Sequence, residues 1–371
     1  MPHYLGQVAY RHGSPAAAGA LLVNLGTPEA PTPAAVRRYL RQFLSDPRIV
    51  EAPRWLWWPI LHGFVLRVRP AHSAALYAKI WTPEGSPLAI GTTALATSLQ
   101  SALKQVRPGP IVVRHAMRYG EPSIPHVLRD MLHAGVRRLI VLPLFPQYSG
   151  TTSASVFDAV AAELAGWRWV PEVRFVADYH VEPRYIEALA RSVEAHQQAN
   201  GRAQRLLLSF HGIPQRYFRG GDPYFCQCQA TARALRERLD LREADVTVCF
   251  QSKVGREPWL QPYTEDIVAN LPREGVTHVQ VLCPGFAIDC LETLEEIALR
   301  NRESFLAAGG EQFEYIAALN ASENHVATLG DLILRHGQGW PEFDPAWNEA
   351  RAGAQRARER TRHERLRDAT R

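Results

Sequence analysis

The sequence predicts an α/β protein with parallel sheets and a duplicated architecture. Short apolar runs alternate with helical patterns along the 371 residues, which is typical of parallel strands joined by crossover helices. The apolar runs fall into two sets of four. The stretches LLVNLGTP and LLLSFHGIP open the two sets in the same way, with an apolar strand, small turn residues and a proline. A chain of this length also suffices for two domains of ordinary size.

The first set of runs predicts the first sheet. Its strands are expected at residues 20–24, 111–114, 138–144 and 173–176. Apolar residues at helical spacing predict helices at 152–164 and 184–197. The second of these helices ends near the polar stretch QQANGR. We therefore expect the domain boundary near residue 200, with domains at 1–200 and 201–340.

The second set of runs predicts the second sheet. Its strands are expected at 205–210, 246–250, 278–282 and 313–317, with helices at 231–239, 291–306 and 323–336. Open parallel sheets bind their ligands beyond the carboxyl ends of the strands. Candidate functional residues are therefore expected directly after these runs.

The formal charge of +5 is concentrated in the C-terminal tail. Residues 351–371 contain eight arginines against three acidic residues, which equals the excess of the whole chain. The body is therefore near neutral, and this argues against a nucleic-acid-binding protein, which needs basic residues on a folded face. The Arg-rich tail is expected at 341–371, and within it we expect residues 351–371 to be a solvated helix or disordered. A weak contact with acidic lipid is the alternative.

Other sequence features exclude some classes of protein. The five cysteines form no secreted disulfide framework, and Cys226 and Cys228 are interpreted as unligated thiols because no second pair at zinc spacing follows them. The N-terminus has no apolar segment of the signal-peptide type, so the cytoplasm is the expected compartment. Neither phosphate-binding glycine motif is present, so the sequence does not support nucleotide binding.

His211 follows the apolar run LLLSF and precedes a glycine and a proline. The position is where a parallel sheet presents its chemistry, and a histidine there can accept protons near neutral pH or bind a metal. The alternative is that it only caps the strand.

The stretch VLCPGFAIDCLETLEEI is the second candidate segment. Asp289 and Glu292 stand where a helix begins, and their spacing resembles a capping box. The same helix start lies at the carboxyl end of a predicted strand. If both strands lie in one sheet, Glu292 can face His211, and an imidazole with a carboxylate can bind a divalent metal or pass protons.

Two further loops offer contacts for a flat ligand. FQSKVGREPWLQPYTED places Ser252 and Trp259 after a strand, and Trp259 is a candidate wall for a planar molecule. RHAMRYGEPS occupies the matching place in the first half. It offers Arg118 and Tyr119, a cation and a ring that suit a planar ligand with carboxylates. Ordinary loop packing is the alternative for Trp259.

A Trp-rich stretch at residues 52–70 suggests a hydrophobic lip. Its apolar part covers about 12 residues and is interrupted by a proline, a histidine and a glycine, whereas about 20 residues are needed to span a bilayer. Arginines flank it, so it suits contact with a membrane interface or an oily ligand. The alternative is a helix buried between the domains.

Taken together, ten segments of the chain resemble the ferrochelatase family. In family order they are LLVNLGTPEAP, FLSDPRIVE, GSPL, MRYGEPSI, LPLFPQYS, SFHGIPQRY, GDPY, FQSKVGREPWLQPYT, CPGFAIDCLETLEEI and YIAALN, and they cover roughly residues 21–320. The form of HGIP and of CPGFAIDCLETLEEI is similar to proteobacterial members that use protoporphyrin IX.

This resemblance implies two Rossmann-like domains of the chelatase type, each a parallel sheet flanked by helices, with a porphyrin between them. It implies a lyase that inserts ferrous iron into protoporphyrin IX in the last step of haem biosynthesis, with release of two protons and no nucleotide. By resemblance His211, Glu292 and Asp289 are catalytic, and His211 and Glu292 are equally candidate iron ligands. The residues expected to contact the substrate are Leu25, Arg118, Tyr119, Ser252, Trp259 and Phe286.

The chain also departs from the family pattern. Cys290 stands where some members have a histidine, which puts a proton-relay role for that position in doubt. No cysteine follows Cys290, so no [2Fe–2S] cluster is expected and iron is a substrate only. A chelatase for another tetrapyrrole, such as coproporphyrin III, and a non-catalytic porphyrin or haem carrier remain alternatives. Peripheral contact of the protein with the inner face of the membrane is a further expectation.

Overall fold

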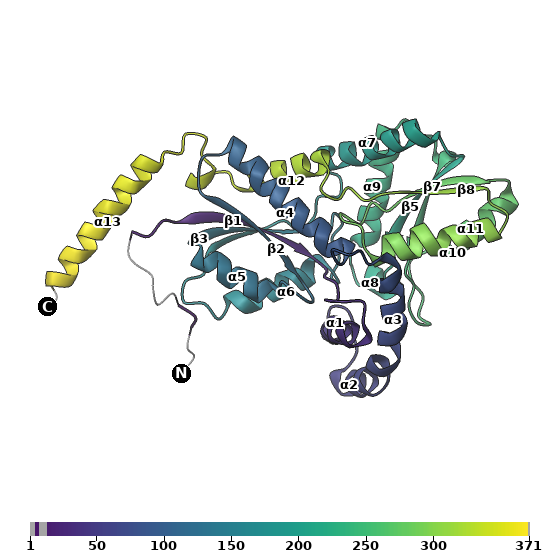
Figure 1. Ribbon diagram of the computed structural model, residues 1–371, viewed down its shortest axis with the longest axis horizontal. Helices are drawn as coiled ribbons and strands as arrows, with labels where there is room; N and C mark the ends of the chain where they lie inside the picture. The colour runs from purple at the N-terminus through teal and green to yellow at the C-terminus, as the bar shows by residue number, and fades with distance from the viewer. Residues whose placement is uncertain (1–3, 7–12, 370–371) are drawn as a thin grey trace.

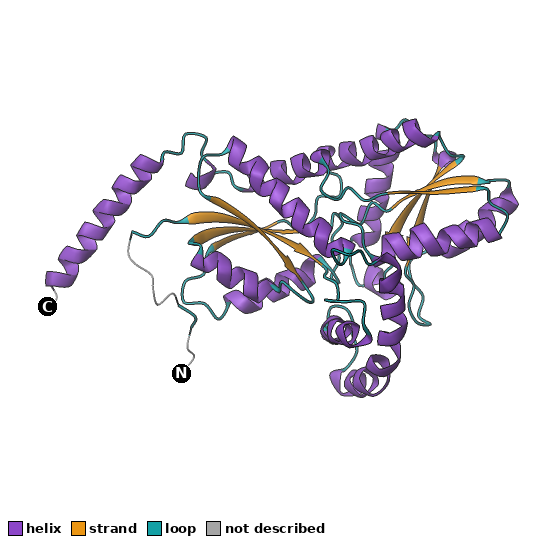
Figure 2. Ribbon diagram, viewed as in Figure 1, coloured by secondary structure: helices purple, strands orange, loops and turns teal. Residues whose placement is uncertain are grey.

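A computed structural model describes residues 4–6 and 13–369 of the chain (Figure 1). Two four-stranded parallel sheets form its framework, with strand orders β2-β1-β3-β4 and β6-β5-β7-β8 (Figure 2). The orders correspond strand for strand, so the predicted α/β class and its duplication are confirmed. The strands are β1 (Ala17–Asn24), β2 (Ile111–Met117), β3 (Val136–Pro143), β4 (Glu172–Phe175), β5 (Arg205–His211), β6 (Val246–Gln251), β7 (His278–Leu282) and β8 (Gln312–Ile316).

The central strands explain why the sequence shows continuous apolar runs. Every residue of β1 is buried, because the strand pairs with β2 and β3 and is covered on both faces. Most of β5 is buried for the same reason, between β6 and β7. Its last residue, His211, is the first that emerges from the core.

Helices cover both sheets. The first sheet carries α4 (Pro87–Val106), α5 (Ile124–His133) and α6 (Ser153–Leu164). The second half contains α8 (Gln215–Arg219), α9 (Tyr224–Arg238), α10 (Thr264–Asn270), α11 (Arg302–Ala307) and α12 (Glu323–His336). Helix α7 (Pro183–Asn200) packs against α9, α12 and β8, and α12 also packs against α4. The helices thus join the halves into a shared core, and the domain limits at residues 200 and 340 stay a prediction.

Two of the family-like segments connect the halves directly. In GDPY, the Asp222 carboxylate accepts hydrogen bonds from Gly150 N at 2.7 Å and Ser149 Oγ at 2.9 Å, both in the segment after β3. Gln147 in the same segment donates to Thr231 Oγ1 of α9 at 3.0 Å. These buried contacts place the carboxyl end of the first sheet beside the second half.

The chain beyond α12 returns to the first sheet before it leaves the body. In the turn Pro341–Phe343, Glu342 is buried and pairs with Arg138 of β3 at 2.7 Å, and Phe343 is buried as well. Helix α13 (Glu349–Ala369) then extends away from the body (Figure 1). The expected solvated helix is thus found in α13, which is largely exposed over residues 349–365, whereas residues 341–343 pack against the first sheet. Residues 370 and 371, like 1–3 and 7–12 of the N-terminal stretch, lie outside the described residues.

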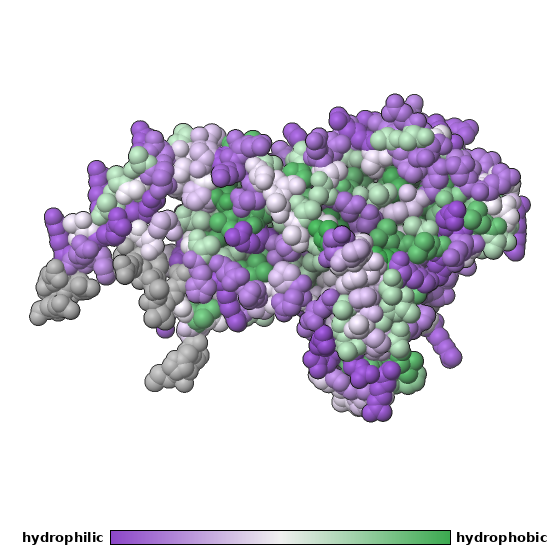
Figure 3. Space-filling model, in the orientation of Figure 1, coloured by the Kyte–Doolittle hydropathy of each residue, from purple (hydrophilic) through white to green (hydrophobic). Residues whose placement is uncertain are grey.

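A helical projection forms the predicted lip. It contains α1 (Pro33–Ser45), α2 (Arg54–Ile60), the π-helical turn η1 (Leu61–Val65) and α3 (Leu66–Ile80), which extend below the second half in Figure 1. No residue of α2 is buried, and Trp55 is 79% exposed. The alternative of a buried helix is therefore wrong for α2. Figure 3 shows apolar colour on this projection. Within the described residues, no helix is long and apolar enough to cross a membrane.

Candidate active site

His211 lies at the carboxyl end of β5, half-buried between two aromatic rings. Its ring centroid is 6.4 Å from that of Trp259 and 6.5 Å from that of Phe286. Its Nδ1 lies 2.6 Å from the carbonyl oxygen of Gly212. Because a carbonyl can only accept, Nδ1 carries the proton. The neutral imidazole therefore keeps its lone pair on Nε2, which is the atom available to a proton or a metal.

The HGIP turn brings Trp259 to this histidine. Gly212 N donates to Gln251 O at 2.8 Å, and Leu260 N donates to Ile213 O at 2.9 Å. A Cβ on Gly212 would lie 3.0 Å from Gln251 O and 3.2 Å from the Trp259 ring, so only glycine fits without displacing them. Trp259 Nε1 is buried and has no hydrogen-bond partner within the part of the chain that the structure describes.

Gln251 connects the two residues expected to carry the chemistry. In the β5–β6 register it lies opposite His211. Its side chain donates to the Glu292 carbonyl oxygen at 2.8 Å and accepts from Ser209 Oγ at 2.8 Å. The strand pair therefore determines where Glu292 begins its helix. Sequence reasoning missed this residue, because the predicted run stops at 250, whereas β6 continues to Gln251.

Glu292 begins a π-helix, η4 (Glu292–Asn301), which α11 continues. The lip packs against this region, since α3 contacts η4. Burial raises the pKa of Tyr39 on α1 and of Tyr77 on α3 well above their ordinary values. The nearby charge of Glu292 raises both pKa values further. Leu25, which follows β1, packs in the same apolar cluster as Leu291. Residues of the lip and of the end of β1 thus lie near the start of η4.

Two other acids of η4 hold neighbouring segments. Glu295 is 1% exposed and pairs with Lys79 of α3 at 3.0 Å, which fixes the lip against the helix. Glu296 accepts from Ser252 N at 2.8 Å and from Ser252 Oγ at 2.5 Å. The hydroxyl of Ser252, a predicted substrate contact, is therefore engaged by Glu296.

Asp289 does not cap the helix. Its carboxylate accepts from Tyr315 Oη at 2.6 Å, Asn320 Nδ2 at 2.8 Å and Thr293 Oγ1 at 3.1 Å. The expected capping box with Glu292 is therefore wrong. The reason is that Asp289 turns toward the end of β8, while Thr293 Oγ1 accepts the hydrogen bond from Cys290 N.

Arg118 and Tyr119 are likewise engaged within the protein. Asp46 accepts from Arg118 Nη2 at 2.6 Å and from the Tyr119 hydroxyl at 2.7 Å, and Tyr119 is only 2% exposed. Burial alone would raise the pKa of the Asp46 carboxyl, but hydrogen bonds from Ser155 and Tyr119 and the Arg118 charge lower it below its ordinary value. Asp46, in FLSDPRIVE, is the partner that sequence reasoning missed.

The structure thus brings some predicted residues together and engages others elsewhere. His211 contacts both Trp259 and Phe286, and Gln251 connects the same strand pair to Glu292. Within the described residues, no group of three or more His, Cys, Asp or Glu side chains is arranged to hold a metal ion.

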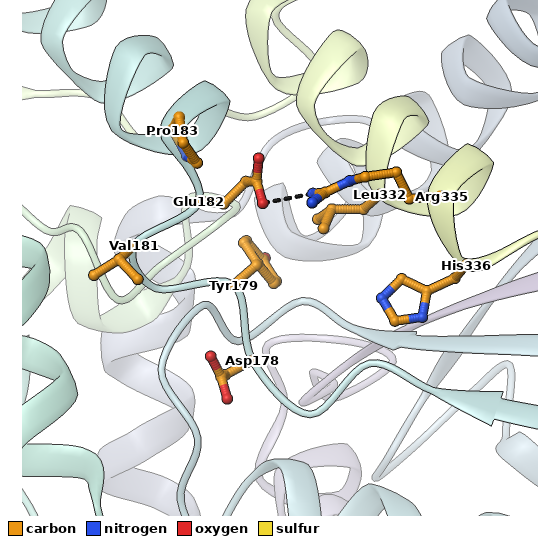
Figure 4. Close-up of a pocket in the computed structure, with 8 residues that line it drawn as sticks. All are labelled: Asp178, Tyr179, Val181, Glu182, Pro183, Leu332, Arg335 and His336. Carbon is orange, nitrogen blue, oxygen red and sulfur yellow. Dashed lines mark hydrogen bonds and ion pairs between the residues drawn. The ribbon is translucent and has the colours of Figure 1, made fainter.

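A pocket of about 350 Å³ lies apart from these residues, between the loop after β4 and helix α12 (Figure 4). An ion pair of 2.5 Å between Glu182 and Arg335 lies along it. None of the predicted site residues lines this pocket. We therefore locate the candidate active site by its chemistry, at the strand ends.

Two matched parallel sheets flanked by helices give this chain an α/β fold of the chelatase type. Two solved structures share this fold. The SirB structure from Bacillus subtilis with Fe3+ has a TM-score of 0.53 and 11% identity, covering 89% of this chain and 100% of that chain. The sirohydrochlorin chelatase SirB with cobalt, from B. subtilis subspecies spizizenii, has a TM-score of 0.52 and 10% identity, covering 90% and 100%.

The family itself follows from sequence. The Ferrochelatase family model matches residues 17–337. The ferrochelatase of Thioalkalivibrio sulfidiphilus is 53% identical over 357 residues, covering 95% of this chain and 97% of that protein. The ferrochelatase of Methylibium petroleiphilum is 55% identical over 347 residues, covering 93% and 95%. The chain belongs to the ferrochelatase family, whose members insert iron into a porphyrin in haem biosynthesis, and the predicted resemblance is confirmed.

Proposed function

We propose that the protein inserts ferrous iron into protoporphyrin IX and releases two protons, forming protohaem in the last step of haem biosynthesis. The observation that supports this most directly is the available Nε2 of His211 between the rings of Trp259 and Phe286, with Glu292 connected to the same strand pair. Iron is a substrate in this reaction. The absence of a [2Fe–2S] cluster remains a prediction from the cysteine positions.

In this proposal the aromatic and apolar side chains hold the macrocycle. Trp259 and Phe286 offer rings, and Leu25 offers an aliphatic contact from the other sheet. A free porphyrin is planar and its nitrogen lone pairs are poorly exposed to an incoming metal. A site that binds a bent ring uses binding energy to strain the substrate toward the metallated geometry.

His211 then accepts one pyrrole proton at Nε2, the one basic nitrogen of its ring, and passes it to solvent before it can accept another. Its Nδ1–H bond to the Gly212 carbonyl keeps the ring in the required tautomer and orientation. Glu292 guides the ferrous ion or takes up the second proton, since a carboxylate does both. Imidazole and carboxylate also suit ferrous iron as ligands, and the variants in the Discussion separate these roles.

The substrate is tested by anaerobic mixing of the purified protein with ferrous iron and either protoporphyrin IX or coproporphyrin III. We expect porphyrin fluorescence to fall over many turnovers with protoporphyrin IX, and more slowly with coproporphyrin III. Faster turnover of coproporphyrin III would make that the substrate. A single stoichiometric change without turnover would indicate a carrier.

We also propose that the lip contacts an anionic membrane surface, which places the cytoplasmic protein at the inner face of the membrane. Trp55 is 79% and Phe64 is 65% exposed on α2 and η1. A pocket of about 220 Å³ beside them has a largely basic lining, formed by Arg37, Arg38, Arg41, His62, Leu66 and Arg67. Exposed aromatic side chains beside basic ones suit the interface of acidic phospholipids, where each arginine contributes about 1 kcal/mol.

Vesicle flotation tests the membrane contact. Replacing Trp55 and Phe64 together by serine should lower binding to phosphatidylglycerol-containing vesicles about tenfold or more, because two large apolar side chains no longer insert. Phe157→Ser is the matched control, since Phe157 is 53% exposed on α6, which is not one of the lip helices. Unchanged binding of the double variant would locate the contact elsewhere, with the Arg-rich helix α13 as the next surface to test.

A further inference from the structure

We infer that Asp289 is a positioning residue, held by Asn320 and Tyr315, that sets the place of Glu292 and is not itself a proton acceptor in the reaction. The inference rests on the proposed function, because it assigns a role within that site. It differs from the role that resemblance implied for this carboxylate.

The first argument is that protein donors already occupy Oδ1 of the Asp289 carboxylate, and that Asn320 holds Oδ2. Oδ1 accepts from Tyr315 Oη at 2.6 Å, Thr293 Oγ1 at 3.1 Å and Ala318 N at 3.3 Å. Oδ2 accepts from Asn320 Nδ2 at 2.8 Å. A carboxylate oxygen has about two lone-pair sites. A proton arriving at Oδ1 would have to displace one of these protein donors.

The second argument is that Asn320 is built to hold this carboxylate. Its φ of 48° lies in the left-handed region, which few residues other than glycine and asparagine adopt. Asn320 N donates to Ala287 O at 3.0 Å, and Asn320 Oδ1 accepts from Asp289 N at 3.0 Å. The amide therefore contacts both the backbone and the side chain of Asp289, so it is fixed in one orientation.

His325 holds the backbone of Asn320 through a hydrogen bond to its carbonyl oxygen. It is wholly buried, and its Nδ1 lies 2.6 Å from the Asn320 carbonyl oxygen. Burial lowers the pKa of His325 to about 4, so the ring stays neutral at physiological pH and donates from Nδ1. This contact stabilises the unusual backbone conformation that aims the Asn320 amide.

The third argument connects Asp289 to the chemistry. Glu292 begins η4 three residues later, and its carbonyl oxygen is held from the other side by Gln251 at 2.8 Å. Tyr315 belongs to β8, the edge strand of the sheet. Glu292 therefore lies between two supports: Gln251 on the β6 side and the Asp289–Asn320–Tyr315 group on the β8 side. Loss of either support would shift its carboxylate.

A reciprocal exchange tests the inference. Asp289→Asn places an amide nitrogen opposite the amide nitrogen of Asn320, so that two donors face each other. Asn320→Asp places two carboxylates next to each other. We expect each single variant to lower kcat about 10- to 100-fold, as a misplaced catalytic group does, with the KM for porphyrin within about threefold. The double variant Asp289→Asn with Asn320→Asp restores an amide opposite a carboxylate. It should return kcat to within about threefold of the original protein.

The outcomes separate the two roles. A double variant that folds with a normal Tm but stays as inactive as Asp289→Asn would overturn the inference, because position 289 would then need its own negative charge. If the wild-type protein does not insert iron, the proposed function is contradicted instead. The exchange variants are then compared by their Tm alone.

Tyr315→Phe provides a second measurement if the exchange variants do not fold. It removes one donor and keeps the carboxylate. We expect a modest fall in kcat and an unchanged pH profile. A pH profile displaced toward higher pH would contradict the inference, since a proton acceptor that loses a donor binds its proton more tightly.

Discussion

His211→Ala is expected to abolish iron insertion while porphyrin still binds. General acid–base groups contribute about 10²- to 10⁴-fold to turnover, and no other histidine is shown in contact with Trp259 and Phe286 among the described residues. The variant keeps both aromatic rings, so the ring contacts proposed to bind the macrocycle remain. Turnover is measured by anaerobic loss of porphyrin fluorescence, and binding by porphyrin titration of the protein's tryptophan emission.

The design allows the role of His211 to be distinguished from a structural one. His126→Ala is the matched control, because His126 is an exposed histidine of α5. Added imidazole is expected to restore part of the turnover of His211→Ala, since a small base can occupy the space that the side chain leaves. Near-normal turnover without imidazole would remove His211 from the mechanism. Loss of porphyrin binding would make it a substrate contact instead.

Glu292→Gln is expected to lower turnover by at least about 10²-fold with little change in stability. Glutamine keeps the size of the side chain and leaves the Gln251 bond to the 292 carbonyl oxygen intact. It removes the negative charge that a ferrous ion or a proton needs. Glu303→Gln is the matched control, because Glu303 is exposed on α11, which continues the same helix.

The dependence on iron concentration separates the two roles of Glu292. If the carboxylate guides the metal, the KM for ferrous iron should rise in Glu292→Gln, and higher iron should recover part of the rate. If it takes up a proton, kcat should fall at saturating iron and the KM for iron should stay unchanged. Wild-type values for both parameters would exclude Glu292 from the site.

Most strand positions could be predicted because buried parallel strands appear in the sequence as continuous runs of apolar residues. The run at 278–282 coincides with β7. The run at 111–114 ends too early, since β2 continues to Met117. The reason is that β2 is an edge strand, so its residues Arg114 and His115 need not be buried. The π-helical form of η4 has no comparable pattern, and it was expected as part of an ordinary helix.

The candidate site was predictable where function depends on a residue's place at a strand end. His211 and Trp259 were chosen for that reason, whereas Phe286 was expected from the family resemblance, and His211 contacts both rings. Gln251 and Asn320 were not chosen, because their importance lies in what their side chains contact. Gln251 reaches Glu292 only because β6 pairs with β5, and Asn320 reaches Asp289 only because the ends of β7 and β8 lie side by side.

The sequence by itself determined the family, the duplicated α/β class and the residue types that stand at the strand ends. Only the tertiary structure decided which of those side chains remain available. Arg118 and Tyr119 donate hydrogen bonds to Asp46, which lies 72 and 73 residues away in the sequence. Asp289 accepts a hydrogen bond from Asn320, 31 residues away. Hydrogen-bond partners at such separations come together only when the chain folds, so no local sequence pattern predicts them. His211 keeps its Nε2 available because its one shown hydrogen bond, to the adjacent Gly212, uses Nδ1.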